Sequence, residues 1–128
     1  LLRDELGLLG TKEGCSEGEC GACSILLDGE VVNACLLLVG QVEGSEVETI
    51  EGISKDPDVQ LLQESFIKTG AVQCGYCTPG VIIALRALLL KNPEPSTKQI
   101  KEAISGNLCR CTGYTKIIEA VEEAVKGV

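Results

Sequence analysis

The stretch KEGCSEGECGAC, at residues 12–23, decides the local fold of the first half of the chain. Glycine and cysteine make up half of it, a composition that suits neither a helix nor a strand, so we predict a loop. A glycine allows the backbone to turn its N–H groups inward where a Cβ would obstruct the turn. The glycines of this loop are Gly14, Gly18 and Gly21, and its cysteines are Cys15, Cys20 and Cys23.

The eight cysteines of the chain fall into two groups of four, which three kinds of site could explain. Disulfides are one, although the cysteine content lies below that of disulfide scaffolds. Structural zinc is the second, since four cysteines suit its tetrahedral geometry. We favour the third, iron–sulfur, because C-x4-C-x2-C…C is the spacing of plant-type [2Fe–2S] sites. The groups are Cys15, Cys20, Cys23 and Cys35, then Cys74, Cys77, Cys109 and Cys111.

The surroundings of both groups suit an anionic cluster. The Gly-studded loop can aim N–H groups at sulfur, and the pairs of the second group precede predicted helix N-termini. We expect the loop to supply more N–H donors than Cys109-x-Cys111 can. The chain has neither His nor Met, so the usual haem and copper sites cannot be assembled.

Composition and charge exclude other classes of protein. The net charge of -8 argues against nucleic-acid binding, which needs a basic surface. The longest apolar stretch, residues 81–90, is interrupted by Arg86 and is too short to span a bilayer. The whole charge imbalance lies in residues 1–50, which predicts two units with a boundary in residues 52–58.

The first half is predicted to be a small β-rich unit with one helix. The spacing of Leu2, Leu6 and Leu9 predicts a short amphipathic helix at the start. Asp28-Gly29 lies between two apolar runs and predicts a hairpin with a type I′ turn. The predicted strands are residues 24–27, 30–35 and 46–50.

The second half changes to helical periodicity and predicts a bundle of four helices. Thr78-Pro79 forms an N-cap and N1 pair, and Ser96 with Gln99 forms a capping box. An apolar stripe of Val59, Leu62, Phe66 and Ile67 marks the first helix. The four are expected to end near Gly70, Lys91, Gly106 and Gly127.

Three motifs together, KEGCSEGECGACSILLDG, QCGYCTPG and SGNLCRCTGY, resemble the small iron–sulfur subunit of the xanthine dehydrogenase/aldehyde oxidase family of molybdenum hydroxylases. The resemblance covers essentially the whole chain. It implies an α+β fold, with a plant-type ferredoxin-like (β-grasp) domain at residues 1–51 and a four-helix [2Fe–2S]-binding domain at residues 58–128. Each group of four cysteines would bind one [2Fe–2S] cluster.

The resemblance also implies an electron-transfer subunit of an oxidoreductase, without a catalytic residue or substrate site of its own. Electrons would pass from a molybdopterin centre on a large partner subunit, through the second and then the first cluster, towards FAD on another. Gln73 and Cys111 would contact the molybdopterin, although Gln73 could instead bond the backbone of the cluster loop. A stand-alone two-cluster ferredoxin or a zinc-binding module are the alternatives.

The sequence departs from the family pattern at two places, of which the first need not affect ligation and the second leaves the β-grasp sheet of the first domain two strands short. Ser16 stands where the family usually has glycine, and a β-hairpin that normally precedes the residue matching Leu1 is missing from this sequence. The sequence opens without Met. We expect a cytoplasmic protein, with the periplasm left open.

Overall fold

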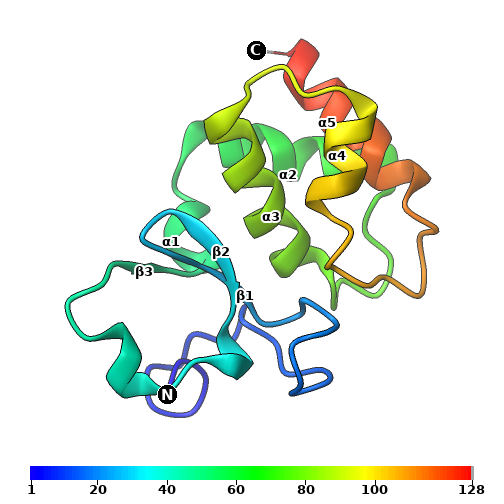
Figure 1. The fold of residues 1–128 in the computed structure, drawn as a ribbon. Helices are drawn as coiled ribbons and strands as arrows, with labels where there is room; N and C mark the ends of the chain where they lie inside the picture. Colours follow the sequence, from blue (N-terminus) through cyan, green and yellow to red (C-terminus); the bar gives the residue numbers. More distant parts are fainter. Residues whose placement is uncertain (128) are drawn as a thin grey trace.

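The computed structural model describes residues 1–127 and has an α+β architecture (Figure 1). A small sheet and long loops form the first half, and helices form the second. The strands are β1 (Ser24–Leu27), β2 (Glu30–Asn33) and β3 (Val47–Glu48), and two 3-10 turns cover Ala34–Leu36 and Val39–Val42. The helices are α1 (Ile50–Ile53), α2 (Pro57–Thr69), α3 (Thr78–Lys91), α4 (Thr97–Ala103) and α5 (Thr115–Lys126).

The β1–β2 hairpin confirms the predicted turn. Asp28 and Gly29 have φ of 51° and 81°, the positive values that a type I′ turn requires. The strands pair antiparallel, with Ser24 opposite Asn33. β2 ends at Asn33, two residues before the predicted strand end at Cys35, because Cys35 lies in a 3-10 turn. β3 pairs with the other edge of β1, giving the order β2-β1-β3, and is shorter than predicted because α1 begins at Ile50.

The helix predicted at Leu2, Leu6 and Leu9 is wrong. Residues 1–10 form turns, in which the N–H groups of Glu5 and Leu6 both donate to the carbonyl of Leu1. Leu6 and Leu9 are 58% and 56% exposed, so the predicted stripe is not buried against the rest of the described chain. A helix this short is not stable without such packing.

Local capping rules set most boundaries of the longer helices. The Asp56 side chain accepts from Asp58 N–H at the start of α2, and Gly70, with φ 74°, ends it as predicted. The predicted capping box of Ser96 and Gln99 opens α4, which ends at Ala103 rather than at Gly106. α3 begins at Thr78, one residue earlier than predicted, because Cys77 rather than Thr78 is its N-cap.

One cluster of buried side chains joins the helices to the sheet. α2 packs against α5, while α3 lies between the other helices and β1 (Figure 1). Leu26 of β1 and Phe66 of α2, each 1% exposed, belong to this same cluster. Ile67 is 76% exposed, so the apolar face of α2 is narrower than the predicted stripe.

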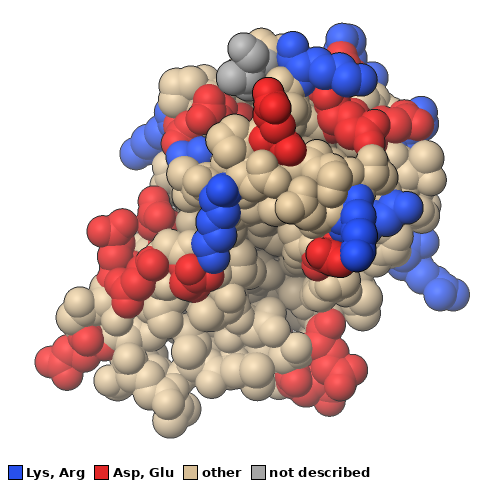
Figure 2. All heavy atoms as spheres, turned by 45° about the horizontal axis from the view of Figure 1, so that its top comes forward, with Lys and Arg blue, Asp and Glu red and all other residues tan. Residues whose placement is uncertain are grey.

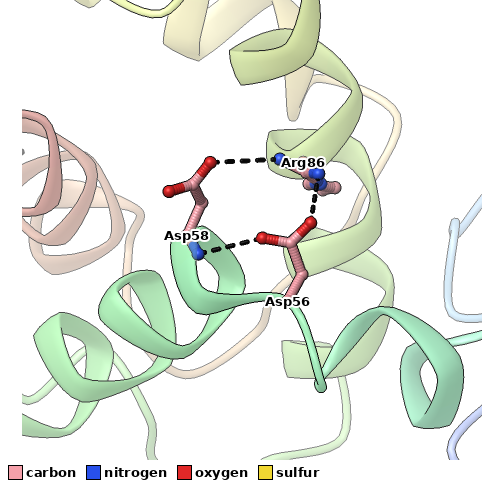
Figure 3. A network of polar contacts seen from close by, with 3 residues as sticks. All are labelled: Asp56, Asp58 and Arg86. Carbon is pink, nitrogen blue, oxygen red and sulfur yellow. Dashed lines mark hydrogen bonds and ion pairs between the residues drawn. The ribbon is translucent and has the colours of Figure 1, made fainter.

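Arg86, the charge inside the apolar run of α3, holds the start of α2 (Figure 3). Its guanidinium pairs with Asp56, the N-cap of α2, and lies 3.7 Å from the Asp58 carboxylate. Only 15% of the Arg86 side chain is exposed, while its charge is compensated by two carboxylates. This contact explains why a charged residue is accommodated in the most apolar helix.

The charged side chains are unevenly distributed over the surface. Figure 2 shows Lys and Arg over the helical part and mainly Asp and Glu over the part that carries the sheet and loops. In residues 1–127, no helix is both long and apolar enough to cross a membrane.

Candidate metal centres

The loop at residues 12–23 directs its backbone N–H groups at two of its sulfurs. The N–H groups of Glu17, Glu19 and Cys20 donate to Cys15 Sγ at 3.4, 3.2 and 3.3 Å. These three donors lower the pKa of the Cys15 thiol to about 7. Cys15 N–H and Ala22 N–H donate in turn to Cys20 Sγ at 3.4 and 3.5 Å. The loop therefore stabilises negative charge on sulfur before any metal is considered.

The loop can wrap this closely because glycine occupies its tightest points. A Cβ on Gly14 would lie 2.7 Å from Cys20 Sγ, and one on Gly18 would lie 2.5 Å from Leu36 Cδ1. Ser16 has a positive φ of 58°, a conformation that glycine adopts more easily. Its hydroxyl donates to Glu13 Oε1 at 3.0 Å.

The hairpin brings the remaining two cysteines of the first group together. Cys23 directly precedes β1 and Cys35 follows β2, so the pairing of Ser24 with Asn33 places them side by side. Burial raises the pKa of the Cys23 thiol, and the neighbouring Cys35 and Cys20 thiols add to that effect. Asn33 Nδ2 donates to Gly18 O at 2.9 Å and ties the hairpin to the loop.

The second group comes from two segments far apart in the sequence. Cys74 and Cys77 lie at the start of α3, whereas Cys109 and Cys111 lie before α5. Burial raises the pKa of Cys77 to about 12, with a further contribution from the Cys109 thiol beside it. The adjacent Cys74 thiol raises the pKa of Cys111. Cys77 thus neighbours Cys109, and Cys74 neighbours Cys111.

Cys109 has its own hydrogen-bond donors. Burial alone would raise its pKa, but hydrogen bonds from Thr112, together with those from the Cys111 backbone and the Cys77 thiol, place the pKa of Cys109 below its usual value. Thr112 N–H donates to Cys109 Sγ at 3.4 Å, and the Thr112 hydroxyl lies 3.1 Å from the same sulfur.

Both groups therefore consist of two neighbouring thiol pairs. Among residues 1–127, no three His, Cys, Asp or Glu side chains gather at the distances of a single metal ion. A [2Fe–2S] core takes two thiolates at each of its two irons, so it needs two pairs. The N–H groups around Cys15 and Cys109 are the donors that an anionic cluster requires. The donor sets fit such a cluster.

Gln73, predicted to contact a cofactor on a partner, lies beside Cys111 in the structure. Its Nε2 donates to the Cys111 carbonyl at 3.2 Å, and both residues are exposed. This bond is the local role that the sequence left as the alternative. The amide oxygen of Gln73 is not used in it.

Sequence reasoning missed the polar residues that join the two groups. Asn107 is buried, and its Nδ2 donates to Gly21 O and to Ser24 Oγ. Leu108 N–H donates to Cys20 O at 2.9 Å. Asn107 lies inside the quoted SGNLCRC motif, but nothing in the sequence indicates its partner in the first half.

The two tyrosines of the motifs also form polar contacts. Tyr114 accepts from Cys109 N–H at 2.9 Å and donates to Asn107 O at 3.2 Å. The Tyr76 hydroxyl donates to Glu13 O. Tyr76 is 49% exposed, whereas Tyr114 packs against the core.

Comparisons with known proteins identify a matching family and several similar proteins. Residues 49–122 match the family described as "[2Fe-2S] binding domain". The nicotinate dehydrogenase small FeS subunit of Eubacterium barkeri is 55% identical over 126 residues, covering 98% of this chain and 80% of that protein. The xanthine dehydrogenase iron-sulfur-binding subunit of Escherichia coli O157:H7 is 48% identical, covering 98% of this chain and 80% of that protein.

A solved structure shares the fold. The crystal structure of quinoline 2-oxidoreductase from Pseudomonas putida 86 superposes with a TM-score of 0.91 at 48% sequence identity. The match covers 98% of this chain and 78% of that one.

Proposed function

The chain belongs to the family of iron–sulfur subunits of molybdenum hydroxylases, and from this premise we propose how its residues carry electrons. It is an electron-transfer subunit of an oxidoreductase complex, and the hard chemistry belongs to cofactors. The observation that carries this function is the presence of two sets of paired thiols supplied with backbone donors.

The first cluster site consists of Cys15, Cys20, Cys23 and Cys35, and the second of Cys74, Cys77, Cys109 and Cys111. The neighbouring thiols suggest which pair holds each iron. In the second site, Cys77 would share an iron with Cys109, and Cys74 with Cys111. In the first, Cys23 would share an iron with Cys35, which leaves Cys15 with Cys20. When bound, each cluster supplies one-electron redox chemistry.

The chain is proposed to consist of two domains. We assign a plant-type ferredoxin-like domain to residues 1–51 and a four-helix [2Fe–2S]-binding domain to residues 58–128. The β1–β2 hairpin next to the cluster loop supports the first assignment. The packing of α2 against α5, with α3 beside them, supports the second.

The partners are a large molybdopterin-binding subunit and an FAD-binding subunit. Cys111 and Cys74 are the exposed cysteines of the second site, and Gln73 lies beside Cys111, which supports contact of Gln73 and Cys111 with the molybdopterin. Electrons would enter at Cys111 and leave from the first site towards FAD. We place the complex in the cytoplasm, with the periplasm as the alternative.

Metal analysis with optical spectroscopy tests the function. The purified chain should hold about four iron atoms and about four acid-labile sulfides, two of each per site, and should be brown. Stoichiometric zinc in a colourless protein would support a structural module instead. A monomeric, stable two-cluster protein that binds neither partner subunit would favour a stand-alone ferredoxin.

A further inference from the structure

Three segments of backbone meet between the two cysteine groups at a junction formed by Gly21, Gly80 and Asn107. A Cβ on Gly21 would lie 2.3 Å from the carbonyl oxygen of Gly106. A Cβ on Gly80, in the first turn of α3, would lie 2.4 Å from the carbonyl oxygen of Gly21. Both distances are impossible for a real side chain against backbone. The segments approach this closely only because both positions are glycine.

Asn107 fastens this junction from within. Its side chain is buried, and Nδ2 donates to Gly21 O at 3.1 Å and to Ser24 Oγ at 3.1 Å. The next residue, Leu108, donates its backbone N–H to Cys20 O at 2.9 Å. A buried amide with both hydrogens used fixes the position of the backbone that follows it.

The Leu108–Cys20 hydrogen bond joins a cysteine of one group to the neighbour of a cysteine of the other. Starting at Cys109 Sγ, the path follows the Cys109 and Leu108 backbone, crosses this one bond and reaches Cys20 Sγ. The contact of Tyr76 with Glu13 also links the groups, but its path runs through a phenol ring and Gly14. The Leu108 side chain is 57% exposed and contributes nothing to the shorter path.

We propose that the Leu108–Cys20 peptide hydrogen bond is the electronic bridge between the two cluster sites, and that Asn107 and Gly80 are the positioning residues that hold it. This inference rests on the proposed function. One electron leaves a reduced cluster at the second site and reduces an oxidised cluster at the first. No covalent bond forms or breaks, and a low-potential reductant supplies the electron.

Two isosteric variants of the cluster-loaded chain test the role of Asn107. Asn107→Asp replaces the donor that faces Gly21 O by an acceptor, whereas Asn33→Asp removes a similar bond to Gly18 O that stays within the first half. The measurements are the electron paramagnetic resonance of each reduced cluster, the spin–spin interaction between them, and electron equilibration after pulse radiolysis. Amide exchange of residues 105–109 is followed by mass spectrometry.

Asn107→Asp should keep both resonance signals, weaken their spin–spin interaction and slow equilibration. Loss of one buried hydrogen bond should quicken amide exchange at Leu108 about five- to tenfold. Asn33→Asp should leave the spin–spin interaction and the exchange of residues 105–109 unchanged.

A second pair of variants covers the case in which Asn107→Asp does not fold. Gly80→Ala forces the first turn of α3 away from Gly21, while Gly106→Ala adds a methyl group in the same junction where no atom lies within 4 Å. Only Gly80→Ala should weaken the interaction between the clusters.

The outcomes separate the two proposals. A wild-type chain that takes up no [2Fe–2S] cluster would overturn the proposed function. A wild-type chain with both clusters, combined with folded variants whose spin–spin interaction and equilibration rate match it, would overturn only the bridge.

Discussion

The two cysteine groups reach similar donor sets by opposite means. Three cysteines of the first lie in one short, glycine-rich stretch whose own N–H groups surround Cys15 and Cys20, and the hairpin adds Cys35. The second is assembled from two distant segments, and the Thr112 and Cys111 backbone donates to Cys109 Sγ. The predicted excess of N–H donors in the first loop is therefore confirmed.

Two thiols, one from each group, show the opposite effects of amide donors and of burial on the pKa. Amide hydrogen bonds hold the pKa of Cys15 near 7, whereas burial in the helical half raises the pKa of Cys77 to about 12. Backbone donors favour the thiolate, and an apolar surround disfavours it. Ionisation of the Cys77 thiol therefore depends more on metal binding than ionisation of the Cys15 thiol does.

The largest effect is expected from a substitution that removes a ligand of the second cysteine group. Cys109→Ser should lose the second cluster and loosen the helical bundle, because metal binding there contributes folding free energy. Iron content should fall to about half, with the first resonance signal retained. Cys15→Ser is the reciprocal control and should lose the other signal. Retention of both signals in either variant would contradict the assignment of ligands.

The pH dependence of alkylation tests the difference in pKa between the Cys15 and Cys77 thiols. In the cluster-free, reduced chain, alkylation at Cys15 should rise through pH 7 and level off above pH 8, as its lowered pKa requires. At pH 8, Cys15 should react about thirty- to ninety-fold faster than Cys77, after allowing for the lower nucleophilicity of the more acidic thiol. Peptide mass spectrometry after timed iodoacetamide treatment gives the rates. Equal rates at all eight cysteines would show that the loop loses its structure without metal.

Redox potentials test whether amide donors or net charge decide the comparison. The excess acidic residues of the first half would lower the potential of its cluster, whereas the N–H donors of the loop would raise it. Surface charges are screened within about 8–10 Å, so we expect the first cluster to have the higher potential. A redox titration of the assembled complex, with signals assigned by cysteine variants, gives the order. If the signal lost with Cys15 has the lower potential, net charge is decisive.

The smallest expected effect concerns one hydroxyl beside the second group. Tyr114→Phe removes the acceptor of Cys109 N–H and the donor to Asn107 O. The free energy of unfolding should fall by about 1 kcal/mol, and the melting temperature by about 3–5 °C. Tyr76→Phe, at an exposed site, is the matched control and should stay within about 0.5 kcal/mol of wild type. Calorimetry of both cluster-loaded variants decides, and equal changes would contradict the role of the Tyr114 hydroxyl.

Elements governed by neighbouring residues were predictable from the sequence. Asp28-Gly29 specified its turn, and Ser96 with Gln99 specified the start of α4, because the interacting groups lie within one turn of chain. The leucine stripe at residues 2–9 failed because periodicity does not reveal whether a packing surface exists.

The candidate sites also contain one part that the sequence predicts and one part that it does not. Cysteine spacing indicated both groups of four, because the ligands of each iron–sulfur motif recur at fixed separations. The junction could not be predicted, since Asn107 meets Gly21 only after both halves have folded. The sequence likewise does not predict that Tyr114 adopts a positive φ, 70°, because glycine is the residue expected to do so and Gly113 directly precedes it.

The order of the cysteines along the chain also bears on biosynthesis. A ribosome releases the N-terminal part first, so residues 15–35 emerge with a full set of four thiols before residues 74–111 exist. Iron delivered during translation would meet the loop site while Asn107 and Leu108 are still unsynthesised. The bond from Leu108 to Cys20 can form only after residue 108 has been made. Translation thus sets the order in which the two groups of thiols become available, the loop group before the helical group.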